Sequence, residues 1–548
     1  MAESEIPRMR WWGWGDPEHP SALPGEALSF LREAVGTLPR PRPPVTLSRV
    51  QLAPSALSEA TLDRLRAIVG SEHVRADHEE RVFHAAGKGY PDLVRMRAGE
   101  PDGAPDAVVL PGGAEQLTAL LALCAQSSLA VVPFGGGTSV VGGVAPLRGE
   151  HAGVIALDTS RMGDPLALDA LSRTVTVQAG MRAPALERHL AKSGLTLGHY
   201  PQSFEYVSLG GCAATRSAGQ ASTGYGRIEQ MIAGLLMSSP SGEIALPALP
   251  ASAAGPSLRQ LLIGSEGTLG VISELSLRVR PAPRERIYEG VFFESFSAGA
   301  RALRELIQHR AAPDVARLSD EAETRMSLAL AGSGGIKGTL GRVYLCARGY
   351  SPGCIAIFGY EGEQAGARRE RGLQIARESG GLPVGRSPGE AWLKGRFAAP
   401  YLRDELLTLG VMVETLETAT QWSNVERLHA VVGKAIADAL HDGDTPGLVM
   451  CHLSHLYETG ASLYFTFIAR QREGEEIAQW HRVKEAASRA IAEGDGTITH
   501  HHAVGVDHAP WMTAEVGEGG VRALRALKDE LDPVGIMNPG KLVGAEER

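Results

Sequence analysis

The segment that most constrains this chain is PFGGGTSVVGG at residues 133–143, which places five glycines within eleven residues. It follows the apolar run LAVV at residues 129–132, so we expect a strand that ends in a glycine-rich turn. Glycine lets the backbone approach a ligand closely, and the N–H groups of such a turn can surround a phosphate. A dinucleotide fingerprint would need glycine instead of Val140, and a Walker loop would need lysine instead of Gly143. Taken alone, the segment also fits a glycine-rich hairpin that binds nothing.

Two later segments favour the ligand-binding interpretation. Residues 201–232 read PQSFEYVSLGGCAATRSAGQASTGYGRIEQMI, and residues 264–272 read GSEGTLGVI. In this order and spacing, across residues 105–284, the three segments resemble the vanillyl-alcohol oxidase/PCMH superfamily of FAD-binding proteins. The resemblance implies that the first loop holds the pyrophosphate and that the other two line the flavin and the adenine half.

The same resemblance implies which residues contact FAD. They are Pro133, Phe134, Gly135, Gly136, Gly137, Thr138, Ser139, Gln202, Ser203, Ser208, Gly210, Gly211, Thr215, Arg216, Ser217, Ala218, Glu266, Gly267, Thr268, Leu269, Gly270, Val271 and Ile272. Gln202 departs from the family, which often has an acidic residue at that place. Relatives that link the flavin covalently carry a histidine in the first loop where this chain has Thr138, so we expect non-covalent FAD.

Composition narrows the class of protein. A length of 548 residues predicts two or three domains, and a net charge of −9 argues against a nucleic-acid binder. The five cysteines are scattered without a C-x-x-C pair, which is typical of a reducing compartment. The N-terminal sequence lacks a signal peptide and no apolar run is long enough to span a membrane, so we expect a cytoplasmic protein. The opening RWWGWG either anchors the chain at a membrane surface or, as we favour, buries its tryptophans against the body of the protein.

We expect an α+β protein in three parts. Residues 1–103 form an N-terminal accessory region with helices over residues 23–35 and 57–69. Residues 104–284 form a two-subdomain, PCMH-type FAD-binding domain, as the resemblance implies. Residues 285–548 form an α+β substrate, or cap, domain whose C-terminal tail returns to the flavin domain. Within it we predict strands over residues 342–348 and 463–469, a loop over 332–338, and helices near 361–379, 424–440 and 474–493.

A more specific resemblance covers nearly the whole chain. RWWGWGDPE, ARLSD, YLRDE, ASLYFTF and HHHAVG occur in this order, and together they resemble the alkyldihydroxyacetonephosphate synthase branch. That branch uses FAD as an electron sink without net redox and exchanges the acyl chain of acyl-dihydroxyacetone phosphate for a long-chain fatty alcohol, which yields an ether lipid precursor. We also expect a homodimer, and peripheral contact with a membrane surface stays open.

The branch resemblance assigns roles to two arginines and a tyrosine. Arg317 in ARLSD and Arg403 in YLRDE match residues that bind the substrate phosphate, and Arg403 is also catalytic; a guanidinium suits a phosphate because it donates two parallel hydrogen bonds. The alternative for either arginine is a solvated surface charge. Tyr464 in ASLYFTF matches the catalytic tyrosine, and the alternative is a core tyrosine. As a base, Tyr464 would need a neighbouring imidazole or arginine to lower its pKa or relay the proton.

His500, His501 and His502 leave several chemistries open. Three imidazoles suggest a metal, but neighbouring residues of a strand point to opposite faces and the usual zinc spacings are absent, so we expect no metal. Proton transfer or phosphate contact suits histidine better, because it titrates near neutral pH, and a structural role stays open. The sequence does not show which of the three faces the flavin.

The fold does not decide the reaction, because function depends on the site. The leading hypothesis is an FAD-dependent alkylglycerone-phosphate synthase-like transferase. The alternative is an FAD-linked oxidase or dehydrogenase of a small 2-hydroxy acid, and a flavin-binding protein without catalysis is the third.

Overall fold

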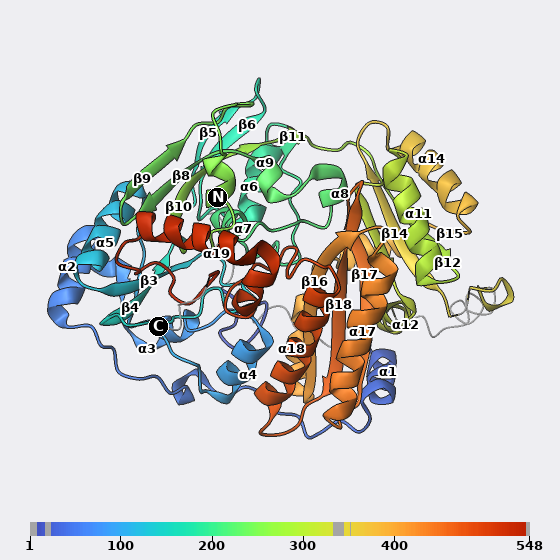
Figure 1. Cartoon of the computed structure of the whole chain (residues 1–548), viewed down its shortest axis with the longest axis horizontal. Coiled ribbons are helices and arrows are strands. Elements are labelled where there is room, and N and C mark those ends of the chain that lie inside the picture. Colours follow the sequence, from blue (N-terminus) through green and yellow to red (C-terminus); the bar gives the residue numbers. More distant parts are fainter. Residues whose placement is uncertain (1–7, 17–22, 332–344, 351, 544–548) are drawn as a thin grey trace.

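The computed structural model describes residues 8–16, 23–331, 345–350 and 352–543. It consists of two units that lie side by side, one built from the blue and green segments and one from the yellow and orange segments (Figure 1). None of the described helices combines the length and the hydrophobicity needed to span a bilayer.

The first unit contains two main sheets. The smaller has the strand order β1-β2-β4-β3, and the larger has the order β5-β6-β10-β8-β9. The strands are β1 Val74–Arg75, β2 Ala107–Val109, β3 Leu129–Phe134, β4 Gly153–Asp158, β5 Pro165–Asp169, β6 Thr174–Gln178, β8 Ile232–Ser239, β9 Gly242–Leu246 and β10 Val271–Arg278, with a separate pair of β7 Leu195–Thr196 and β11 Arg280–Pro281. The helices are α5 Ala114–Gln126, α6 Ala183–Ala191, α7 Leu209–Ala214, α8 Ser222–Tyr225, α9 Ile228–Met231 and α10 Leu258–Leu262.

The second unit is one seven-stranded sheet in the order β15-β12-β14-β13-β17-β18-β16. Its strands are β12 Arg286–Phe293, β13 Val315–Ser319, β14 Cys354–Glu361, β15 Leu382–Gly385, β16 Val411–Gln421, β17 Gly447–Leu456 and β18 Gly460–Arg470. Its helices are α11 Phe296–Gln308, α12 Glu321–Leu330, α14 Ala365–Glu378, α15 Ser387–Gly395, α16 Ala399–Thr408, α17 Val425–Asp442 and α18 Glu476–Glu493. The helices predicted near 361–379, 424–440 and 474–493 therefore correspond to α14, α17 and α18.

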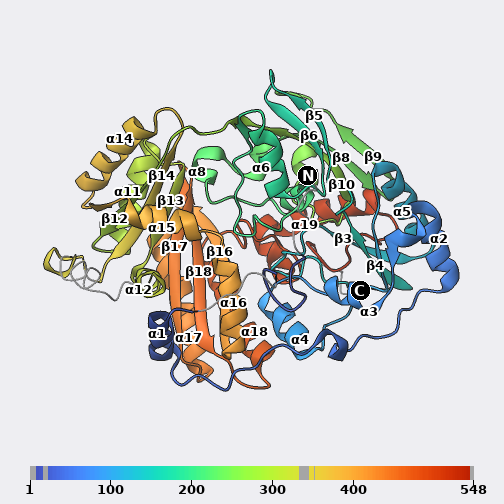
Figure 2. The ribbon, with the colours of Figure 1, turned by 180° about the vertical axis from the view of Figure 1, so that it is seen from behind.

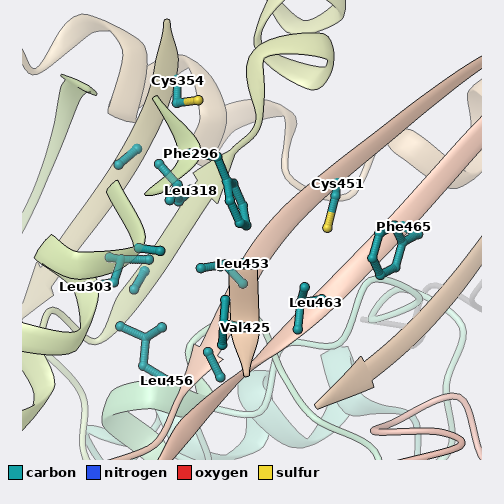
Figure 3. Packing of buried hydrophobic residues seen from close by; sticks show 14 of the residues in the cluster. Phe296, Leu303, Leu318, Cys354, Val425, Cys451, Leu453, Leu456, Leu463 and Phe465 are labelled. Carbon is teal, nitrogen blue, oxygen red and sulfur yellow. The ribbon is translucent and has the colours of Figure 1, made fainter. Parts of the chain in front are cut away.

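The two faces of this sheet have different coverings. Buried residues of α11, α14, α17 and α18 pack on one face and form a continuous apolar core, part of which is shown in Figure 3. The opposite face is covered by α12, α15, α16 and the N-terminal α1 Gly25–Val35, which are seen from behind in Figure 2. Side chains alternate between the two faces along each strand. Of two neighbouring residues, one therefore points into the apolar core and the other points to the opposite face.

The N-terminal residues contact both units. Helix α1 packs on α12, β17 and β18, whereas α2 Glu59–Val69 packs on α5 of the first unit and β1 joins its sheet. The short helices α3 His78–Phe83 and α4 Tyr90–Ala98 follow β1. Trp11 and Trp14 are buried, and the backbone N–H of Trp14 donates to the Asp404 carboxylate of α16. Burial of the tryptophans against the body of the protein, which the sequence favoured over a membrane anchor, is confirmed for these two residues.

The C-terminal segment returns to the first unit. Helix α19 Met512–Leu531 crosses that unit, and the N–H and C=O of Val131 in β3 bond to Ile536 and Asn538. One strand prediction, over residues 342–348, was wrong: residues 345–347 are helical and residue 348 lies in a turn. Residues 342–344 of that strand, and the loop expected at 332–338, lie outside the described residues.

Candidate active site

A cavity of about 960 Å³ lies between the two units. The glycine-rich loop after β3 and the segment around α7 form one wall, and the sheet face under α1, α12, α15 and α16 forms the other. Alternate residues of β17 and β18 face the cavity, namely Met450, His452, Ser454, Tyr464, Thr466 and Ile468. Their sequence neighbours Cys451, Leu453 and Phe465 lie in the core on the opposite face (Figure 3).

The first wall has the properties of a phosphate cradle. No backbone N–H of residues 135–139 donates a hydrogen bond within the described part of the chain, so five donors are available beside the cavity. A Cβ on Gly136 would lie 2.4 Å from the carbonyl oxygen of Tyr206, and Gly137 has φ of +66°. Glycine is required at residue 136 because there is no room for a Cβ, and at residue 137 because of the positive φ. The loop that results fits a pyrophosphate.

Most of the predicted FAD residues line this cavity, but Arg216, Thr268 and Leu269 do not. The Arg216 guanidinium donates to the carbonyl oxygens of Gln260 and Ile263. The Thr268 hydroxyl donates to a backbone carbonyl, and Leu269 is buried in the core of the first unit. These three side chains therefore position the loops. Lining residues that the sequence did not single out include Thr159, Gln220 and Ser265.

Both predicted arginines line the cavity and each is paired with an acid. Arg317 Nη2 lies 2.8 Å from Glu323 Oε1, and Arg403 Nη2 lies 3.3 Å from Glu414 Oε1. Burial would raise the pKa of Glu323, but Arg317 and His452 hold it below its usual range. Arg403 is only 7% exposed, so it is not a solvated surface charge.

Tyr464 lies at the centre of an aromatic group. Its ring centroid is 4.7 Å from that of His452, 5.9 Å from that of His501 and 5.5 Å from that of His502. Burial raises the pKa of Tyr464, and the opposing effect of Arg403 does not reverse this. The hypothesis of a tyrosine with a lowered pKa is therefore wrong, and the hydroxyl keeps its proton at neutral pH.

The three consecutive histidines lie in a bend and not in a strand. The argument that strand alternation separates their side chains therefore does not apply. His501 and His502 line the cavity, whereas His500 lies behind them with its Nε2 2.6 Å from the Tyr457 hydroxyl. Burial lowers the pKa of each of the three imidazoles, so they are neutral at pH 7.

Glu417, which no sequence motif marked, holds this bend in place. It lies opposite Tyr464 in the β16–β18 register, and its side chain is fully buried. Its carboxylate accepts the backbone N–H groups of all three histidines. Burial would raise the pKa of Glu417, but the facing imidazoles and the Thr499 hydroxyl hold it below its usual range. The sequence signal that could have identified Glu417 is an acidic residue inside the apolar strand VMVETLETATQ.

The far end of the cavity is an apolar arm. Here α1, α12 and α16 cover the sheet. The wall of this arm is made of the apolar side chains of Leu23, Pro24, Ala27, Leu31, Met326, Leu406, Val413, Met450 and Ile468. The cavity therefore has a cradle at one side, a polar centre with two arginines, and an apolar extension.

Comparisons with known proteins agree with this arrangement. Residues 105–245 match the FAD binding domain family, and residues 282–542 match the FAD linked oxidases C-terminal domain family. Alkyldihydroxyacetonephosphate synthase of Trypanosoma brucei brucei is 31% identical, covering 99% of this chain and 94% of its own length. The synthase of Dictyostelium discoideum is 30% identical, covering 98% and 93%. A solved structure of alkyldihydroxyacetonephosphate synthase superposes with a TM-score of 0.85 at 28% identity, covering 98% of this chain and 99% of that one. The predicted α+β, PCMH-type FAD-binding fold and the FAD cofactor are confirmed.

Proposed function

The chain belongs to the alkyldihydroxyacetonephosphate synthase family, and on that premise we propose how its cavity carries out the family's reaction. It is an FAD-dependent, alkylglycerone-phosphate synthase-like transferase of ether lipid biosynthesis. We infer that it exchanges the acyl chain of acyl-dihydroxyacetone phosphate for a long-chain fatty alcohol. The observation that carries this inference is the amphipathic cavity, because its arginines and its apolar arm match the phosphate and the hydrocarbon chain of one substrate.

Arg317 and Arg403 are the proposed phosphate ligands. Both arginines line the cavity. Glu323 holds one Nη group of Arg317, whereas the two Nη groups of Arg403 are held by Glu414 and by the Lys88 carbonyl oxygen, so the direction of each guanidinium is fixed before the substrate arrives. Such pre-organised, charge-assisted donors bind a dianion strongly. The substrate's hydrocarbon chain then extends toward Met450 and Ile468.

The proton transfer is assigned to Tyr464 and the histidine bend. The protonated Tyr464 hydroxyl donates to the ketone oxygen and makes the C1 hydrogen more acidic. His501 accepts that proton at Nε2, because its Nδ1 lies 2.9 Å from His500 Nδ1 and its Nε2 has no partner among the described residues. His502 is the neighbouring alternative. Bound FAD supplies the electron sink at the reacting carbon, and the chain's own residues position the substrate and move the proton.

The proposed FAD site consists of the glycine-rich loop at residues 133–139, residues 202–218 and residues 266–272. Thr138 cannot form a histidyl bond, so we propose that FAD is held without a covalent link. Acid precipitation of the purified protein should leave intact FAD in the supernatant. Flavin retained in the precipitated chain would contradict this assignment.

A direct assay separates the transferase from the alternative oxidase. The FAD-loaded protein, given acyl-dihydroxyacetone phosphate and hexadecanol, should release fatty acid and form alkyl-dihydroxyacetone phosphate without consuming oxygen. Anaerobic bleaching of the flavin by a small 2-hydroxy acid, with no fatty acid released from the acyl substrate, would establish the redox function instead.

Several expectations stay predictions. Four expectations rest on the sequence and on the family resemblance: the domain boundaries at residues 103/104 and 284/285, the cytoplasmic location, contact with a membrane surface, and a homodimer. Flotation with liposomes measures the membrane contact, and chromatography with light scattering measures the oligomeric state.

A further inference from the structure

Three imidazoles form a compact triangle beside the cavity. His455 lies in β17 with a positive φ of 52°, which turns its ring toward His500 and His501 in the bend. The ring centroids are 5.0 Å apart for His455 and His500, 5.1 Å for His455 and His501, and 5.2 Å for His500 and His501. One ring nitrogen of each residue lies within 4.8 Å of the other two.

This triangle has the size of a three-histidine metal site. With Zn–N bonds of about 2.1 Å, tetrahedral angles and ring centres about 1.2 Å beyond each nitrogen, the centroids of ligating rings lie about 5.4 Å apart. The ligating nitrogens would be about 3.4 Å apart in that geometry. His500 Nδ1 and His501 Nδ1 are 2.9 Å apart, so small ring rotations bring the set into place.

Two further features match metal-ligating histidines. A ligating histidine usually uses its second ring nitrogen to bond a neighbouring oxygen, which fixes its tautomer. His455 Nδ1 lies 2.5 Å from the Ser222 hydroxyl, and His500 Nε2 lies 2.6 Å from the Tyr457 hydroxyl. His455 and His501 line the cavity, so the fourth position is open to water or to a substrate oxygen.

The local charge also favours a cation. Arg227, which donates to the His500 carbonyl oxygen, is ion-paired with Glu229 at 2.8 Å. The Glu417 carboxylate lies beneath the bend, so the fixed charges around the three neutral rings sum to one negative charge.

We propose that His455, His500 and His501 form a binding site for a divalent transition ion that prefers imidazole nitrogen, of which Zn²⁺ is the probe, and that occupancy inhibits the enzyme. Inhibition follows because an imidazole that ligates through Nδ1 carries its hydrogen on Nε2, so His501 can no longer accept a proton there. This inhibitory role rests on the proposed function, whereas binding itself does not.

The experiment uses FAD-loaded protein without an affinity tag, treated with chelator and titrated with Zn²⁺ by isothermal calorimetry. We expect one tight site in the wild-type protein, at least 100-fold weaker binding in His455→Gln, and 10- to 100-fold weaker binding in Ser222→Ala. The matched variant His441→Gln alters an exposed histidine and should bind as the wild type does. Flavin content and melting temperature verify that each variant is folded.

Activity provides the second readout. Zn²⁺ should inhibit the wild-type transferase, EDTA should restore it, and whatever activity His455→Gln retains should be insensitive to Zn²⁺. The proposal is overturned if the wild-type protein binds no Zn²⁺ at 100 µM, or if His455→Gln binds it with unchanged affinity. If Zn²⁺ binds as expected but the protein shows no transferase activity, the site stands and the proposed function fails.

Discussion

Glu417→Gln tests whether the histidine bend depends on one buried carboxylate. Oε1 of Glu417 accepts from the Thr499 hydroxyl at 2.7 Å, from His502 N–H at 2.7 Å and from His501 N–H at 3.0 Å, and Oε2 accepts from His500 N–H. Glutamine can keep the first three bonds through its oxygen. Its NH₂ group then faces the His500 N–H, so two donors oppose each other.

The size of the effect follows from these contacts. Loss of one hydrogen bond to a charged acceptor costs about 1.5–3 kcal/mol, and an unsatisfied buried donor costs about 1–3 kcal/mol more. The bend is therefore disfavoured by about 2.5–6 kcal/mol relative to other loop conformations. Because about 1.4 kcal/mol corresponds to a factor of ten, we expect kcat to fall by at least about 50-fold, measured as fatty acid released from acyl-dihydroxyacetone phosphate.

A matched variant separates misplacement of the bend from general loss of stability. Glu289 is equally buried and is paired with Arg369, and the described cavity lining does not include it. Glu289→Gln should lower the melting temperature but leave kcat within about threefold at 25 °C. Glu417→Gln with near-normal kcat would refute the role given to the carboxylate, and so would an equal loss of kcat in Glu289→Gln.

Four further outcomes are expected. Gly136→Val should yield protein without FAD, because its Cβ would collide with the Tyr206 carbonyl; yellow protein with full flavin content would contradict the cradle. Arg403→Lys should lower kcat/KM ten- to 100-fold at unchanged FAD content, since lysine cannot replace the planar guanidinium, and loss of FAD would reassign Arg403 to the fold. Tyr464→Phe should bind FAD and substrate but fail to exchange the C1 hydrogen with solvent; normal exchange would leave the histidines as the sole acid–base groups. Burial raises the pKa of Asp92 to about 7, so its contribution to stability is complete below its usual pKa and is lost as pH rises through 7. Asp92→Asn should therefore gain melting temperature relative to wild type between pH 5.5 and pH 8, and a constant difference would contradict this.

The sequence predicted best those parts of the site that lie on continuous segments. The cradle is one loop after one strand, so residues 133–139 could be assigned from glycine spacing and family resemblance. Arg216 was expected to contact FAD, but nothing in the segment ATRSAG shows that its side chain turns toward the carbonyl oxygens of Gln260 in α10 and of Ile263 directly after that helix. Contacts of this kind depend on where a second element packs.

The polar centre could be predicted only in part, because strand pairing brings its members together. Glu417, His452 and Tyr464 lie on three different strands and meet through register. The sequence showed Tyr464 through a local motif, but no local pattern connects it with Glu417 or with His452. The histidine bend was misjudged for a related reason: without Glu417, the segment was expected to be extended.

The same alternation that folds the seven-stranded sheet also orders the cavity. Along β17 the cavity face carries Met450, then His452, then Ser454, so the wall changes from apolar to polar along the strand. Strand β18 runs antiparallel and places Thr466 opposite Met450 and Tyr464 opposite His452, with Ile468 two residues beyond Thr466, so both strands become polar at the same end. A one-residue slip of β17 would exchange His452 for Cys451 or Leu453 and place an imidazole in the apolar core. Burial of the core face thus fixes the register, and the register places Arg317 and Tyr464 at the head of an apolar arm. Helix α16 adds Arg403 there, which completes the arrangement that an amphipathic substrate requires.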